Sequence, residues 1–77
     1  DINYDEFLEF ISNRYGEDAD KIKKIDSFSE LGLDSLSLFS LLEDIETKYN
    51  IKVDVDDLTE IDSVSKMYKC ILKNINN

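Results

Sequence analysis

The chain of 77 residues contains no histidine, no proline and no tryptophan, and it has one cysteine and two glycines. Without histidine, it lacks the commonest general base and the usual nitrogen ligand of zinc. The single cysteine, Cys70, excludes an internal disulfide and a Cys-His catalytic pair. No apolar run approaches the ~18 residues of a transmembrane helix. We therefore expect no metal site and no membrane span, and an enzyme is disfavoured.

The size and the cysteine content indicate one small intracellular domain. Seventy-seven residues are too few for two cores, so residues 1–77 are expected to form a single domain. No secretory signal is visible, and a cytoplasmic location is expected. The chain begins at Asp1 without a methionine, which leaves open a free-standing protein and a domain cut from a longer one.

The charge is strongly acidic, with 9 basic and 18 acidic residues and a net charge of −9. This field repels phosphate backbones, so nucleic acid is not an expected partner. It attracts basic protein surfaces and speeds encounter with them. The plainer alternative, that the surplus carboxylates only keep the domain in solution, stays open on charge alone.

Apolar spacings of three and four predict three main helices. The first carries Phe7, Leu8, Ile11 and Tyr15, begins after Asn3 or Asp5 and ends at Gly16. The second covers residues 35–49 and ends at Asn50. Its inward face is predicted to be Leu36, Phe39, Leu42, Ile45 and Tyr49, widened by Leu41, with Leu38 on the exposed flank. The third follows a cap at Asp62 or Ser63, with Val64, Met67, Tyr68, Ile71, Leu72 and Ile75 inward.

The connections complete an all-α prediction. Residues 17–34 are expected to form a long ordered loop, pinned to the core by Ile22, Ile25, Phe28 and Leu31. Residues 51–55 alternate like a strand, but a lone strand has no partner, so we expect an extended connector. Residues 56–60 are predicted to form a short helical turn, and residues 74–77 to be frayed. The fold class is a small bundle of three main helices plus one short helix.

The most informative segment is Leu-Gly-Leu-Asp-Ser-Leu-Ser at residues 31–37, where the loop meets the second helix. A helix N-terminus favours negative charge, because its free N–H groups and its dipole point outward there. Gly32 permits a tight turn, and Leu33 and Leu36 are expected to pin both sides so that the Ser35 hydroxyl faces solvent. The simplest alternative is that Asp34 and Ser35 only cap the helix.

Three segments of the chain, residues 28–36, 42–53 and 61–67, resemble the acyl carrier protein family in the same order. The resemblance implies that Ser35 carries 4′-phosphopantetheine, added from coenzyme A by a separate magnesium-dependent phosphopantetheinyl transferase. Gly32, Asp34 and Leu36 would complete the attachment motif. The thiol of the arm would hold acyl, polyketide or aminoacyl units as thioesters for loading and processing enzymes. Such a chain is a carrier and a monomer. Ser35 would be a tether, since no base accompanies it.

The resemblance also places partner recognition on the second helix, at Leu38, Glu43, Asp44 and Glu46 in addition to Asp34. Housekeeping fatty-acid carriers have acids where this chain has Ser37 and Ser40, and they have a proline in the connector that is missing here. We therefore expect recognition near the arm to be less electrostatic and more apolar. Fatty-acid synthesis and a specialised polyketide, peptide or aminoacyl pathway both remain open.

Further hypotheses concern other parts of the sequence. An apolar groove beside the second helix, lined by Phe28, Phe39, Leu42 and Ile61, is one place for an acyl chain. The acidic run at residues 54–62 lacks the glycine and the final glutamate of a calcium loop, which argues against an EF-hand. Cys70 is interpreted as a partly buried filler. The rival function is an unmodified acidic helical module that only binds proteins.

Overall fold

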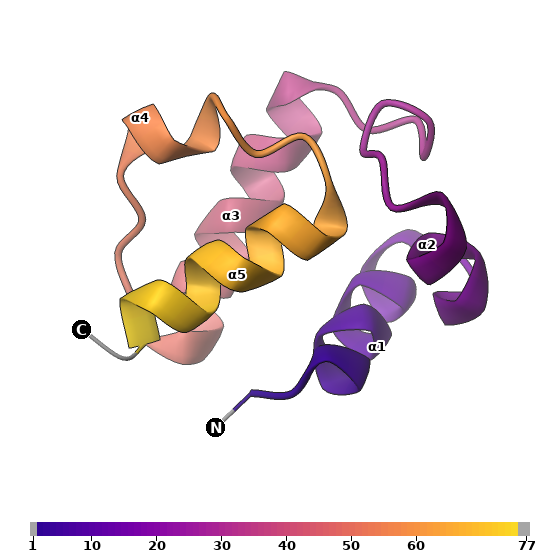
Figure 1. Cartoon of the computed structure of the whole chain (residues 1–77), viewed down its shortest axis with the longest axis horizontal. Helices are drawn as coiled ribbons and strands as arrows, with labels where there is room; N and C mark the ends of the chain where they lie inside the picture. The colour runs from indigo at the N-terminus through magenta and orange to yellow at the C-terminus, as the bar shows by residue number, and fades with distance from the viewer. Residues whose placement is uncertain (1, 76–77) are drawn as a thin grey trace.

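A computed structural model describes residues 2–75 of the chain, and it is almost entirely helical. The helices are α1 (Tyr4–Tyr15), α2 (Ala19–Ile25), α3 (Ser35–Tyr49), α4 (Val55–Leu58) and α5 (Val64–Ile75) (Figure 1). No strand occurs among residues 2–75. Ser27 and Ser63 form an isolated antiparallel β-bridge there. The all-α prediction is confirmed. Of the residues predicted to be frayed, 74 and 75 belong to α5, and 76–77 lie outside the described residues.

The helix ends follow the capping signals of the sequence. Asn3 Oδ1 accepts a hydrogen bond from the Glu6 amide at 2.8 Å, so Asn3 is the cap of α1. Gly16 ends α1, and Asn50 ends α3, each with a positive φ that suits these residue types. Ser63 Oγ accepts from the Lys66 amide at 3.2 Å at the start of α5. The start of α1 and the ends of α1 and α3 are therefore fixed by local contacts.

The predicted long loop is interrupted by α2, so this part of the prediction was wrong. Asp18 caps α2 by accepting from the Asp20 amide at 3.1 Å, and Lys21 pairs with Glu17 at 3.1 Å. Ile22 is the one fully buried side chain of the helix. A helix of seven residues is not stable alone and depends on tertiary packing. The anchors Ile22 and Phe28 are buried as expected.

The core is wholly apolar and draws on all five helices. Its largest fully buried side chains are Phe7, Phe28, Ile11, Ile22, Leu41, Ile45, Met67, Ile71 and Val64. Aromatic contacts join α1 to α5, with the Tyr68 ring 5.0 Å from that of Tyr4 and 5.8 Å from that of Phe7. The Tyr68 hydroxyl donates to the Ile2 carbonyl at 3.2 Å. The segment before α1 is thereby held against α5.

The inward face of α3 differs from the prediction. Leu41, Leu42 and Ile45 are buried, and Leu38 and Tyr49 pack half-buried against the core. Leu36 and Phe39 are instead 80% and 44% exposed. Leu38 lies two residues, or about 200°, around the helix from Leu36, so only one of them can face the core. Leu38 is therefore not an exposed flank, and Leu36 does not pin the serine.

The segment between α3 and α5 confirms an extended connector followed by a short helix. Residues 51–54 have no regular structure, and α4 begins at Val55, one residue earlier than predicted. Asp54 caps α4 by accepting from the Asp56 amide at 3.0 Å. The connector and α4 bring Val55, Leu58 and Ile61 beside the start of α3.

Candidate functional site

Ser35 is the first residue of α3, and its side chain is exposed to solvent. The preceding residue, Asp34, has extended backbone and caps the helix, with its Oδ1 accepting from the Ser37 amide at 2.9 Å. Hydrogen bonds from Ser37 lower the pKa of the Asp34 carboxyl below its ordinary value. Asp34 is therefore a fixed negative charge beside the Ser35 hydroxyl at neutral pH.

The turn before Ser35 is closed by backbone hydrogen bonds. Gly32 has a φ of +82°, which residues with a Cβ adopt at a cost, and its amide donates to the Ser29 carbonyl at 3.0 Å. The Leu33 amide donates to the carbonyl of buried Phe28 at 2.9 Å. The Leu33 side chain packs half-buried against the core, as predicted. Leu33 thus anchors the chain on one side of Ser35, whereas Leu36 on the other side is exposed to solvent.

The same loop is fastened to the start of α5, which the sequence did not reveal. The Asp26 carboxylate accepts from the Ser65 amide at 2.9 Å and from the Ser65 hydroxyl at 2.7 Å. The Val64 amide donates to the Asp26 carbonyl at 2.9 Å, and the Phe28 amide donates to the Asp62 carbonyl at 3.0 Å. Asp26 and Ser65 are 39 residues apart, so no local sequence pattern predicts that Asp26 caps α5.

A groove of about 210 Å³ opens beside Ser35, between α3 and the segment from α4 to residue 61. Five of its seven lining residues are apolar, although polar and apolar atoms contribute about equally to its surface: Ser35, Leu38, Phe39, Val55, Leu58, Thr59 and Ile61. The predicted groove residues Phe39 and Ile61 are correct. Phe28 and Leu42 are buried in the core and are not part of the lining. The volume is below the ~300–1,000 Å³ of pockets that enclose small molecules, so this groove suits part of a chain.

The three carboxylates of α3 are not equivalent. Glu43 is exposed, and within residues 2–75 it is the one that has no side-chain partner. Asp44 forms an ion pair with Arg14 of α1. Glu46 Oε2 accepts from the Val53 amide at 2.8 Å, which ties α3 to the connector. Glu43 is therefore the α3 acid most available to another molecule.

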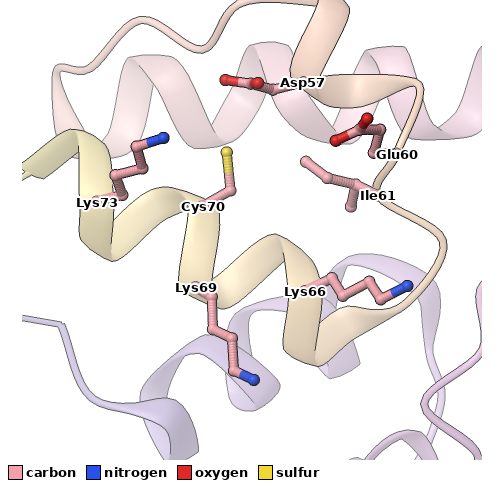
Figure 2. A pocket seen from close by; sticks show the side chains of 7 residues that line it. All are labelled: Asp57, Glu60, Ile61, Lys66, Lys69, Cys70 and Lys73. Atoms are coloured by element: carbon pink, nitrogen blue, oxygen red, sulfur yellow. The ribbon is translucent and has the colours of Figure 1, made fainter.

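A larger groove, of about 530 Å³, lies between α4 and α5 and is not lined by Ser35. Figure 2 shows Cys70 between Lys66 and Lys73, with its sulfur toward Asp57 and Glu60, while Lys69 points away. Partial burial, together with the negative charge of Asp57, raises the pKa of the Cys70 thiol. Cys70 is a free, partly buried side chain, as predicted.

Neither a metal centre nor a membrane span is defined in the part of the chain that the structure describes. No group of three or more Cys, Asp or Glu side chains there is arranged to hold a metal ion. None of the five helices is both long enough and apolar enough to cross a bilayer.

The chain thus folds as a small helical bundle with a solvent-exposed serine at the start of α3, beside a groove. The chain belongs to the family defined by the phosphopantetheine attachment site, whose model matches residues 5–71. It is thus a phosphopantetheine-binding carrier that serves partner biosynthetic enzymes, and it is not itself an enzyme. The family prediction is confirmed.

Two curated relatives agree with this family. The acyl carrier protein of Streptococcus thermophilus is 30% identical over 54 residues, which cover 70% of this chain and 73% of that protein. The non-reducing polyketide synthase tazA of Aspergillus terreus is 26% identical over 68 residues, or 88% of this chain. This chain spans only 3% of the synthase. No solved structure matches the chain.

Proposed function

We propose that Ser35 is the attachment site of 4′-phosphopantetheine and that the chain carries acyl or polyketide intermediates on it as thioesters. The observation that supports this most is the exposed Ser35 hydroxyl at the first position of a 15-residue helix, beside an apolar groove. The helix dipole favours the phosphodiester formed there. Ser35 also lies inside the matched segment.

The transfer reaction needs chemical groups that the transferase must supply. The Ser35 oxygen forms a bond to phosphorus, the bond to the nucleotide part of coenzyme A breaks, and the serine proton leaves. The chain has no histidine, and the lowered pKa of the Asp34 carboxyl makes it a poor proton acceptor, so we assign the base to the transferase. The fixed charge of Asp34 repels an incoming anion, and a divalent cation held by the transferase relieves that repulsion.

The surroundings of Ser35 suggest the character of cargo and partners. The exposed large apolar side chains of the described residues are Leu36, Phe39 and Val55, and Phe39 and Val55 also line the groove at Ser35. An apolar stretch of cargo fits this groove, and partner enzymes are proposed to dock on the same three side chains. The patch is small, and a net charge of −9 opposes self-association, so we propose that the chain is a monomer. A cytoplasmic location stays a prediction.

Intact mass spectrometry tests the attachment site. The protein is incubated with coenzyme A, Mg²⁺ and a broad-specificity phosphopantetheinyl transferase, beside a known carrier as positive control. The parent chain and a Ser37→Ala variant are expected to gain one phosphopantetheinyl group, whereas Ser35→Ala gains none. A gain that persists in Ser35→Ala would move the site. No gain in the parent, while the known carrier is modified, would favour the unmodified binding module.

A further inference from the structure

We propose that Arg14 determines partner specificity by masking Asp44 on the partner-facing helix α3. The inference rests on the proposed function, in which enzymes approach α3 next to Ser35. Arg14 is the single arginine of the chain and lies in the last turn of α1. Its guanidinium reaches across to α3, where it forms an ion pair with Asp44 and donates to Ser40 Oγ at 2.6 Å.

Tyr15 holds the guanidinium in this position. Arg14 Nε donates to the Tyr15 hydroxyl at 3.3 Å, and the guanidinium carbon lies 5.6 Å from the centre of the Tyr15 ring. The Tyr15 hydroxyl in turn donates to the Ser37 carbonyl at 3.3 Å. Only 23% of the Arg14 side chain is exposed, so the group is ordered by packing as well as by charge. Arginine suits this role because its planar fork bonds several acceptors at once.

The consequence is a change in the charge of the surface that a partner meets. Ser37, Ser40 and Asp44 are spaced by three and four residues, so they form one stripe of α3. The Arg14 cation at the end of α1 pairs with Asp44, whose side chain stays 52% exposed, so the ion pair neutralises the carboxylate without burying it. Apart from the Asp34 cap at its start, α3 therefore offers a basic partner only Glu43 as an acid without a side-chain partner, and the attraction along the rest of the helix is weak. Partners that approach with apolar surfaces are not affected.

The test measures how well a basic surface binds α3 with and without Arg14. A lysine-rich helical peptide is titrated into the ¹⁵N-labelled protein at 50 mM and 500 mM salt. Arg14→Gln is expected to bind about two- to fivefold more tightly at low salt, as for one newly available exposed ion pair. New shift changes should appear at Ser40 and Asp44. The gain should shrink at high salt, where charges are screened over a few ångströms.

Two further variants separate masking from net charge and from misfolding. Lys69→Gln removes the same charge from α5, at a side chain that points away from the groove there (Figure 2), and should change affinity by less than 1.5-fold. Arg14→Gln/Asp44→Asn should return to the parent affinity if the gain comes from Asp44. Equal effects of Arg14→Gln and Lys69→Gln, or a gain that survives in the double variant, would overturn the proposal. A thermal unfolding curve for each variant confirms that the fold is retained.

The transferase assay then connects the surface to modification. With a transferase whose docking face is basic, Arg14→Gln should raise kcat/KM by a similar factor at low salt, and Lys69→Gln should not. An unchanged kcat/KM would overturn the role of Arg14 in partner choice. Failure of the attachment proposal is recognised separately, because the parent chain would then gain no mass while the peptide titration still reports on Asp44.

Discussion

Asp26 is predicted to be the polar residue whose loss costs the fold most, although it lies outside the attachment motif. It has a φ of +64° and a ψ of −37°, and the Ser27 amide donates to the Ile25 carbonyl across it at 2.7 Å. This is a γ-turn of the positive-φ kind, which is strained by about 1–3 kcal/mol in a residue with a side chain. The bonds from its carboxylate to Ser65 offset that strain.

The expected magnitudes follow from these contacts. A helix cap contributes about 1 kcal/mol, and hydrogen bonds to a charged group contribute about 1.5–3 kcal/mol. Asp26→Ala loses both bonds and keeps the strain, so it should lower the free energy of unfolding by about 2–3 kcal/mol. Asp26→Gly relieves the strain and should cost about 1 kcal/mol less than alanine. Ser65→Ala keeps the amide bond and should cost about 1 kcal/mol.

Urea denaturation at pH 7, followed by far-UV circular dichroism, measures these differences. A domain of this length has about 4–12 kcal/mol of stability in all, so a loss of 2–3 kcal/mol is readily seen. The Asp26→Ala/Ser65→Ala double variant should cost less than the sum of the single variants, because both remove the same hydroxyl bond. A loss below 0.5 kcal/mol for alanine would refute the cap, and a glycine variant less stable than alanine would refute the strain.

Three other predictions concern the site and its neighbours. Asp34→Asn keeps the helix cap at pH 7, but the parent protein should lose stability relative to this variant as the pH falls through the depressed pKa of Asp34. Urea midpoints of both proteins at pH 7 and pH 3 measure this loss. An equal shift of the midpoint in both proteins would contradict the prediction. Gly32→Ala meets no atoms within 4 Å and should cost about 1 kcal/mol from its φ alone, like Gly16→Ala, whereas a much larger loss would indicate a clash. Because the pKa of Cys70 is raised, iodoacetamide at pH 7.5 should alkylate it more slowly than free cysteine, and in the modified protein the arm thiol should react first, with Cys70→Ala as the control.

The parts of the fold that sequence reasoning predicted are those fixed by short-range chemistry. Asn3, Gly16 and Asn50 act within one turn of the helix that each one ends, so residue type is enough to locate them. The family segments likewise placed Ser35 at a loop-to-helix junction, and the structure has it at the first position of α3. Phosphopantetheine was inferred by resemblance, and the family match supports it.

The errors arose where contacts across the fold decide between local alternatives. The first half of α3 has Leu36, Leu38, Phe39, Leu41 and Leu42, so its apolar pattern fits two rotations of the helix about its axis. Packing against the other helices selects the rotation that turns Leu38 toward the core, half-buried, and exposes Leu36. In the same way, α2 is too short and too polar to be predicted from its sequence alone, because its stability depends on packing against the core. The Asp26 cap and the Arg14–Asp44 pair join residues far apart in sequence.

These contacts change what the net charge of −9 means for recognition. The first turn of α3 contains no acid, Asp44 is paired within the chain, and Glu46 holds the connector. Acidic residues are found instead in the first turns of α1 and α4. The overall field still draws a basic enzyme toward the molecule, because its range is about a Debye length. At contact, however, the helix that carries Ser35 presents Leu36 and Phe39, so discrimination among partners depends on apolar fit and on whether Arg14 keeps the charge of Asp44 paired.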